Sequence, residues 1–165
     1  FEYAVENNCH VMSWPLTRSF SEAELYNERL KDAMSASKSN FTPTFAMMRH
    51  AAVYETKSDA EIYVSAIQKI LGQFENLFKN LDDVENGFPK AIDLKDLQNR
   101  DEYDSLMLQE NLMFGTPDEV ISKLKRYEKL GVDNFIYYAS MGLGHEEQKK
   151  SLKLFCNEVI PAFKQ

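Results

Sequence analysis

The sequence predicts an α/β fold built around a parallel sheet. Three segments are almost continuously apolar, and helical patterns alternate with them along the chain. Such alternation produces right-handed crossovers between parallel strands, and apolar runs without alternation indicate a sheet covered on both faces. Glycine and proline supply only 6 and 5 of the 165 residues, which argues against a turn-rich sandwich of short antiparallel strands.

The first predicted strand is the mostly apolar run at residues 9–14, which Pro15 closes. A short helix over residues 1–8 precedes it, and no capping residue stands ahead of that helix. The missing cap leads us to expect that the sequence is a fragment of a longer polypeptide.

The second predicted strand is the apolar run at residues 45–54. A helix over residues 21–37 comes before it, and a helix over residues 58–78 follows it. Each begins with the Ser-x-x-Glu spacing of a capping box, in which a hydroxyl and a carboxylate satisfy free backbone N–H groups. The second of these helices has the strongest amphipathic pattern in the chain.

Residues 82–112 are polar and acidic, with only a weak helical pattern. We expect them to form an inserted excursion with one or two short helices. Thr116, Pro117 and Glu119 then give three helix-start signals in register. Gly131 is placed to end that helix.

The third predicted strand is residues 134–139, followed by a turn over residues 140–144. A last helix follows and Pro161 stops it, with an inward face of Leu152, Phe155, Cys156, Val159 and Ile160. Cys9 and Cys156 fit neither a disulfide framework nor a zinc site, so we expect both in the core.

The charge balance excludes several classes of partner. The chain has 26 acidic and 19 basic residues, for a net charge of -7, and no basic cluster that would bind nucleic acid or an anionic membrane surface. No apolar stretch approaches the roughly 18 residues of a membrane span, and no signal peptide opens the chain. We expect a soluble, cytoplasmic protein. The histidines share no metal-ligand spacing, which predicts no metal site.

Several motifs recur together near the end of the chain: a Gly-Thr-Pro-Asp-Glu helix start, a Leu-Gly-Val-Asp turn, a Gly-x-x-His-Glu-Glu entry to the last helix, and a final Glu-Val-Ile-Pro-Ala-Phe. With them, the segment from Glu110 to Phe163 resembles the C-terminal signature of the luciferase-like flavin-dependent monooxygenases. Upstream, Val53-Tyr54-Glu55-Thr56 resembles that family's penultimate strand. The resemblance spans nearly the whole chain and is weak over residues 82–109.

The resemblance implies that residues 1–165 form a single incomplete domain, the last three βα units of a TIM (β/α)8 barrel, which takes about 250 residues. It also implies a parent enzyme that uses reduced FMN and O2 to oxidise a small molecule. The family's flavin-phosphate segment and earlier strands would precede residue 1. The fragment itself is therefore expected to be inactive and to retain FMN poorly, and its open edges call for the N-terminal remainder of the same protein or another copy.

Active sites of such barrels lie at the carboxyl ends of the strands. The expected cofactor-binding residues are Trp14, Arg49, Ser140, Met141 and Gly142. Trp14 either lies along the flavin or substrate, or is an aromatic that closes the barrel end. Arg49, inside an apolar strand, meets an anionic flavin or substrate oxygen, or forms a structural ion pair. No residue is assigned a catalytic role.

Two alternatives stay open. One is a non-catalytic flavin-binding or self-associating protein on a reduced barrel, which the association state of the chain would test. The other is a deazaflavin (F420)-dependent reductase of the same barrel class, which these residues do not separate from an FMN enzyme.

Overall fold

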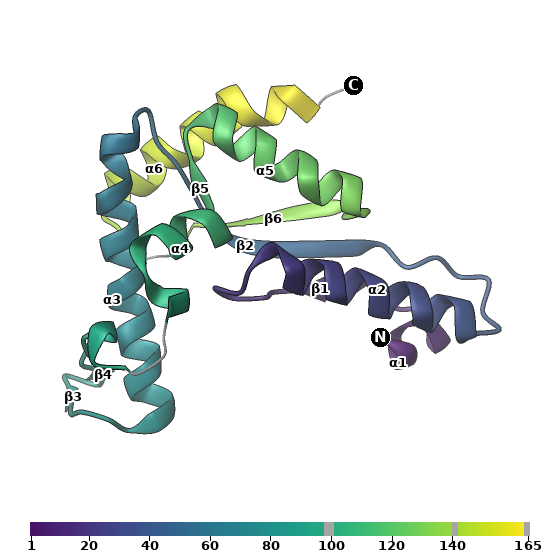
Figure 1. Ribbon diagram of the computed structural model, residues 1–165, viewed down its shortest axis with the longest axis horizontal. Coiled ribbons are helices and arrows are strands. Elements are labelled where there is room, and N and C mark those ends of the chain that lie inside the picture. Colours follow the sequence, from purple (N-terminus) through teal and green to yellow (C-terminus); the bar gives the residue numbers. More distant parts are fainter. Residues whose placement is uncertain (98–100, 140–141, 164–165) are drawn as a thin grey trace.

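The computed structural model describes residues 1–97, 101–139 and 142–163, and it has an α/β fold with a parallel sheet (Figure 1). Its helices and strands are, in order, α1 (Glu2–Glu6), β1 (Val11–Ser13), α2 (Phe20–Ala36), β2 (Phe45–Val53), α3 (Ala60–Lys79), β3 (Val84–Glu85), β4 (Phe88–Pro89), α4 (Ser105–Asn111), β5 (Met113–Gly115), α5 (Pro117–Leu130), β6 (Asn134–Tyr138) and α6 (His145–Leu154).

Strand β2 is the centre of the sheet, and every strand that pairs with it is parallel to it. β1 pairs with residues 45–47, β6 with residues 46–50 and β5 with residues 51–53. β3 and β4 form a separate antiparallel hairpin. The two predicted crossovers between long apolar strands are therefore confirmed as parallel.

Helices cover one face of this sheet. Phe45, Met47, Ala51 and Val53 of β2 are buried there against α2, α5 and the C-terminal segment. On the other face Met12 is 60% exposed, and its neighbours Ala46, Met48 and Ile136 are half-buried. The expectation of a sheet covered on both faces is thus met on one face only over the first part of the strands.

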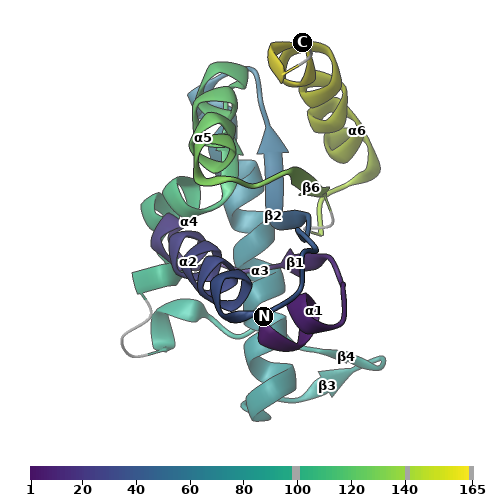
Figure 2. The ribbon, with the colours of Figure 1, turned by 90° about the vertical axis from the view of Figure 1, so that its right-hand side faces the viewer.

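The far end of β2 is covered by a second group of elements. Ala52 and Tyr54 pack with Tyr63 and Ile67 of α3 and with Leu108 of α4 in a core of their own. α3 passes the end of β2 at a steep angle and carries the β3–β4 hairpin at its far end, away from α5 and α6 (Figures 1 and 2). No helix among the described residues is long and apolar enough to cross a membrane.

The capping box predicted at Ser21 is wrong, because α2 begins at Phe20 with Ser19 as its N-cap. The reason is packing: the Phe20 ring meets the Tyr127 ring edge-on at 5.0 Å and lies 4.3 Å from the Arg126 guanidinium. These contacts hold the first turn of the helix without a side-chain cap.

The box predicted at Ser58 is also displaced, since Thr56 and Asp59 form the box instead, at a short 3-10 turn ahead of α3. The start of α5 is as predicted. Thr116 and Glu119 bond reciprocally there. Gly131 ends α5 with a φ of 100°, a backbone conformation that favours glycine.

The excursion at residues 82–112 contains short helices, as predicted, and also the hairpin, which was not expected. Strand β5 was missed as well, because three residues are too few to show a period. Cys9 and Cys156 are exposed, so their placement in the core is wrong. Leu152 is 45% exposed rather than inward. Pro161 does not stop the helix, which runs on through a π turn and a 3-10 turn to Phe163.

Candidate functional site

Three aromatic side chains meet at the carboxyl ends of β1, β2 and β6. Trp14 directly follows β1, and His50 of β2 is the register partner of Tyr138 of β6. The ring centroid of Trp14 lies 5.6 Å from that of His50 and 5.3 Å from that of Tyr138. The rings of His50 and Tyr138 are 4.7 Å apart. We call these residues the strand-end cluster. They share the face that carries Met48, which helices leave partly open.

Two polar atoms of the strand-end cluster have no partner among the described residues. They are the indole Nε1 of Trp14 and the Nδ1 of His50, both buried. His50 is only 3% exposed. Burial, and next the positive charge of Arg49, lower the pKa of the His50 imidazole to about 4. The cluster is therefore neutral at pH 7 and offers hydrogen bonds to a planar ligand rather than charge.

Arg49 points away from that cluster, into the helix-covered side of the sheet. Its Nε donates to the Tyr127 hydroxyl at 2.9 Å. Its terminal nitrogens donate to the carbonyl oxygens of Leu16, Arg18 and Ser19 at 3.1, 2.7 and 3.2 Å. These partners are a hydroxyl and backbone carbonyls, so neither the expected anion nor a carboxylate is among the contacts that the structure gives it. Arg49 fastens the loop between β1 and α2.

The turn after β6 is described only in part, since Ser140 and Met141 lie outside the described residues. Gly142 has a φ of +69°, and a Cβ added to it would lie 3.2 Å from the side chain of Ile70. That position therefore requires a glycine both for its backbone and for its approach to α3.

The remaining strand-end candidates have local roles. Glu55 pairs with Lys150 at 3.2 Å, and Thr56 caps the turn before α3. Thr17 is buried, and its carbonyl accepts a hydrogen bond from Asn111. Ser13 is on the helix side of β1, opposite Met47.

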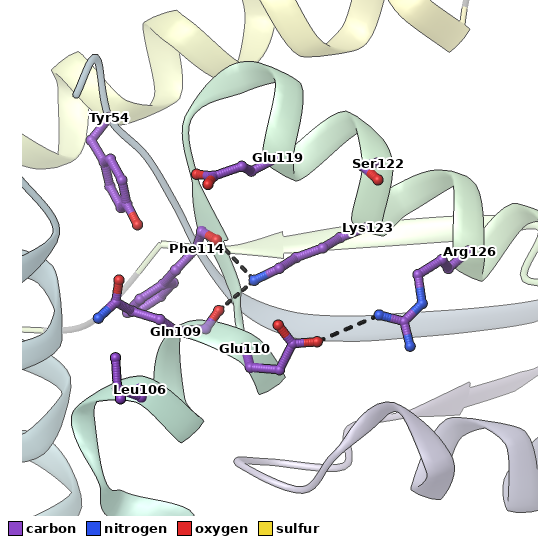
Figure 3. Close-up of a pocket in the computed structure, with 9 residues that line it drawn as sticks. All are labelled: Tyr54, Leu106, Gln109, Glu110, Phe114, Glu119, Ser122, Lys123 and Arg126. Atoms are coloured by element: carbon purple, nitrogen blue, oxygen red, sulfur yellow. Dashed lines mark hydrogen bonds and ion pairs between the residues drawn. The ribbon is translucent and has the colours of Figure 1, made fainter. Parts of the chain in front are cut away.

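A second cavity, of about 350 Å³, opens between α4 and α5 (Figure 3). Lys123 forms its inner wall and donates to the carbonyl oxygens of Gln109, Leu112 and Phe114. Burial lowers the pKa of the Lys123 ammonium to about 8. The ammonium thus holds the end of α4 and strand β5, and the contacts of this cavity are structural.

Sequence reasoning missed His50 and Tyr138. The signal was present: neighbours in a strand point to opposite faces, so only one of Arg49 and His50 can line the open face. The unusual arginine drew attention to itself, whereas the histidine is the member on that face. Among the described residues, no group of three His, Cys, Asp or Glu could hold a metal ion.

Comparison with known proteins places this geometry in context. No family model matches the chain. It is 27% identical over 164 residues to the oxygenase component of a flavin-dependent trigonelline monooxygenase from Acinetobacter baylyi, and this covers 99% of the chain and 46% of that protein. Its fold matches the crystal structure of the monooxygenase RslO1 from Streptomyces bottropensis with a TM-score of 0.62 and 20% identity, over 99% of the chain and 44% of that structure. The chain thus spans under half the length of both proteins.

Proposed function

We propose that this chain supplies the C-terminal portion of a luciferase-like flavin-dependent monooxygenase. In this proposal β1, β2 and β6 are the last three strands of a TIM (β/α)8 barrel, and residues 82–112 are an insertion before the last of them. The observation that carries the proposal is the sequence similarity to a flavin-dependent oxygenase component along 99% of the chain. Parallel strands with one face free of helices support it, because a barrel buries that face inside.

The strand-end cluster suits a flavin ring or a planar substrate. Trp14 and His50 each bury a polar atom that no described residue satisfies, and such atoms are normally paired. In the proposed parent, the Trp14 N–H donates to a ring acceptor, and the neutral His50 donates or accepts at Nδ1. Arg49 takes no part in holding the phosphate, since its donors are engaged within the chain.

Reduced FMN, when bound, supplies the electrons for the reaction with O2. The chain's own residues orient and shield that group. Met48 and Ile136, adjacent on the open face of β2 and β6, keep water from the strand ends. The near-neutral His50 neither gives nor takes a proton at pH 7, so in this proposal it positions rather than acts as an acid or base.

The proposal extends to the chain by itself and to its partners. The phosphate-binding turn belongs, by the resemblance, to strands before residue 1, so the 165-residue chain alone should bind FMN weakly and turn nothing over. The small-molecule substrate and O2 meet only in the parent. The partner that completes the barrel is the N-terminal remainder of the same protein.

Oxygen uptake by the complete protein tests this function. Purified protein supplied with reduced FMN, alone or with a reductase and NADH, should change the course of O2 consumption relative to free flavin, and reduced deazaflavin should not replace FMN. A complete protein with no flavin in its absorption spectrum and no effect on O2 uptake would exclude the proposal.

Variants of the cluster refine the same test. Trp14→Ala and His50→Ala should each weaken FMN or substrate binding about tenfold or more, which corresponds to roughly 1.4 kcal/mol. Met12→Ala is the matched control, because Met12 lies on the same face two residues earlier and is 60% exposed. Equal affinity in all three variants would remove the cluster from the site.

A further inference from the structure

Helix α3 carries an apolar stripe that its own chain covers only in the first half. Tyr63 and Ile67 are buried, whereas Phe74, Leu77 and Phe78 are 38%, 57% and 78% exposed. The stripe follows spacings of four and three residues through Tyr63, Ile67, Ile70, Phe74 and Leu77. Alternating spacings of this kind form the seam between two packed helices. The second half of α3 has such a seam, and no described helix of this chain covers it.

The residues that follow α3 enlarge this surface. Leu81, Val84 and Phe88 are 50%, 62% and 71% exposed. Phe88 and Pro89 of the hairpin line a groove of about 190 Å³ with Phe74 and Leu77. We call the exposed apolar set the α3 stripe: Phe74, Leu77, Phe78, Leu81, Val84 and Phe88.

The α3 stripe is large enough to matter for association. With about 200 Å² for a whole phenylalanine side chain, the exposed fractions of its six members amount to roughly 600 Å². A stable dimer buries about 800 Å² on each partner, including a polar rim. Monomeric proteins rarely leave an apolar patch of this size open to water.

Charge favours a second copy of this chain as the occupant. The chain has a net charge of -7, so two copies repel wherever their charged surfaces meet. Along the seam the flanking residues are the amides Gln73 and Asn80. Glu75 is turned away, 9% exposed and bonded to Lys79 and Tyr103. Flanking charges normally select a different partner helix, and this seam has none.

We propose that two copies associate through the α3 stripe, with the two α3 helices antiparallel about a two-fold axis. The first half of α3 is buried under the rest of the chain, so a parallel pair would press the two bodies together, and an antiparallel pair separates them. In this arrangement Phe74 packs against the partner's Leu77 and Leu77 against the partner's Phe74. A two-fold axis makes each contact occur twice.

Sedimentation velocity of the complete natural protein over a range of concentrations tests the association. The wild type should be a dimer. Leu77→Glu should raise the dimer dissociation constant at least about a hundredfold, because the charge enters the seam twice. Leu152→Glu is the matched control: Leu152 is 45% exposed on α6, and its variant should stay a dimer. Phe78→Gln serves as a second seam variant, and far-UV circular dichroism confirms that each variant is folded.

Cysteine cross-linking tests the orientation, after Cys9 and Cys156, which are exposed, are replaced by serine. A mixture of Phe74→Cys and Leu77→Cys proteins should form disulfide-linked dimers faster than either protein alone. Cross-linking of each protein with itself at an equal or higher rate would overturn the antiparallel arrangement. A monomeric wild type, or a dimer that Leu77→Glu leaves intact, would overturn the proposal. Neither result bears on flavin binding, so this proposal and the proposed function fail independently.

Discussion

Replacement of Arg49 by methionine should destabilise the protein by about 3 kcal/mol. Arg49 is fully buried and donates to the Tyr127 hydroxyl and to three loop carbonyls. Methionine fills much of the same volume but donates nothing. Each carbonyl left without a donor costs about 1–3 kcal/mol when it is buried. Part of that loss is offset, because methionine avoids the desolvation of a charge, which also lowers the pKa of the Arg49 guanidinium.

Urea denaturation measures this loss through the fluorescence of Trp14, the one tryptophan in the chain. Arg18→Met is the matched control: its side chain is 64% exposed and 3.6 Å from Glu102, so the loss there should stay below about 1 kcal/mol. Arg49→Lys should fall between the two, since one ammonium reaches fewer of the carbonyls. Equal stability of Arg49→Met and Arg18→Met would refute the role given to Arg49 in fastening the loop before α2.

Two further predictions concern titration and capping. The pKa of His50 is about 4 in the fold against an ordinary 6.5, so stability is complete above pH 6.5 and falls as the pH drops towards 4, by about 3 kcal/mol at most; His50→Phe should flatten the dependence of the urea midpoint in that window, and an unchanged slope would contradict the burial argument. Thr116→Ala should lower the free energy of unfolding by about 1 kcal/mol through loss of the capping box, whereas Ser122→Ala, at an exposed position of the same helix, should not; thermal melts of both variants distinguish these outcomes.

Features with long or reciprocal sequence patterns could be predicted. β2 has nine residues, and its apolar run shows both its length and its parallel setting. Thr116, Pro117, Glu119 and Gly131 mark both ends of α5, because each acts through its own backbone neighbours. The amphipathic pattern of α3 was equally clear, although what covers its second half is a tertiary question.

Features set by distant contacts could not be predicted. α2 begins at Phe20 because the ring packs on Tyr127 and Arg126 of α5, a contact that no local pattern encodes. β5 is a strand only because it pairs with the end of β2. For the candidate site, strand alternation shows that Arg49 and His50 face opposite sides, but only the packing of α2 and α5 decides which side is open.

The central claim is that the strand ends of this chain form part of a flavin site. Anaerobic titration of the complete natural protein with reduced FMN, followed by calorimetry, tests it most directly. We predict saturable binding of micromolar affinity or tighter, weakened about tenfold or more by His50→Ala and unchanged, per folded molecule, by Arg49→Met. No saturable binding, or a loss that follows Arg49 and not His50, would contradict the account.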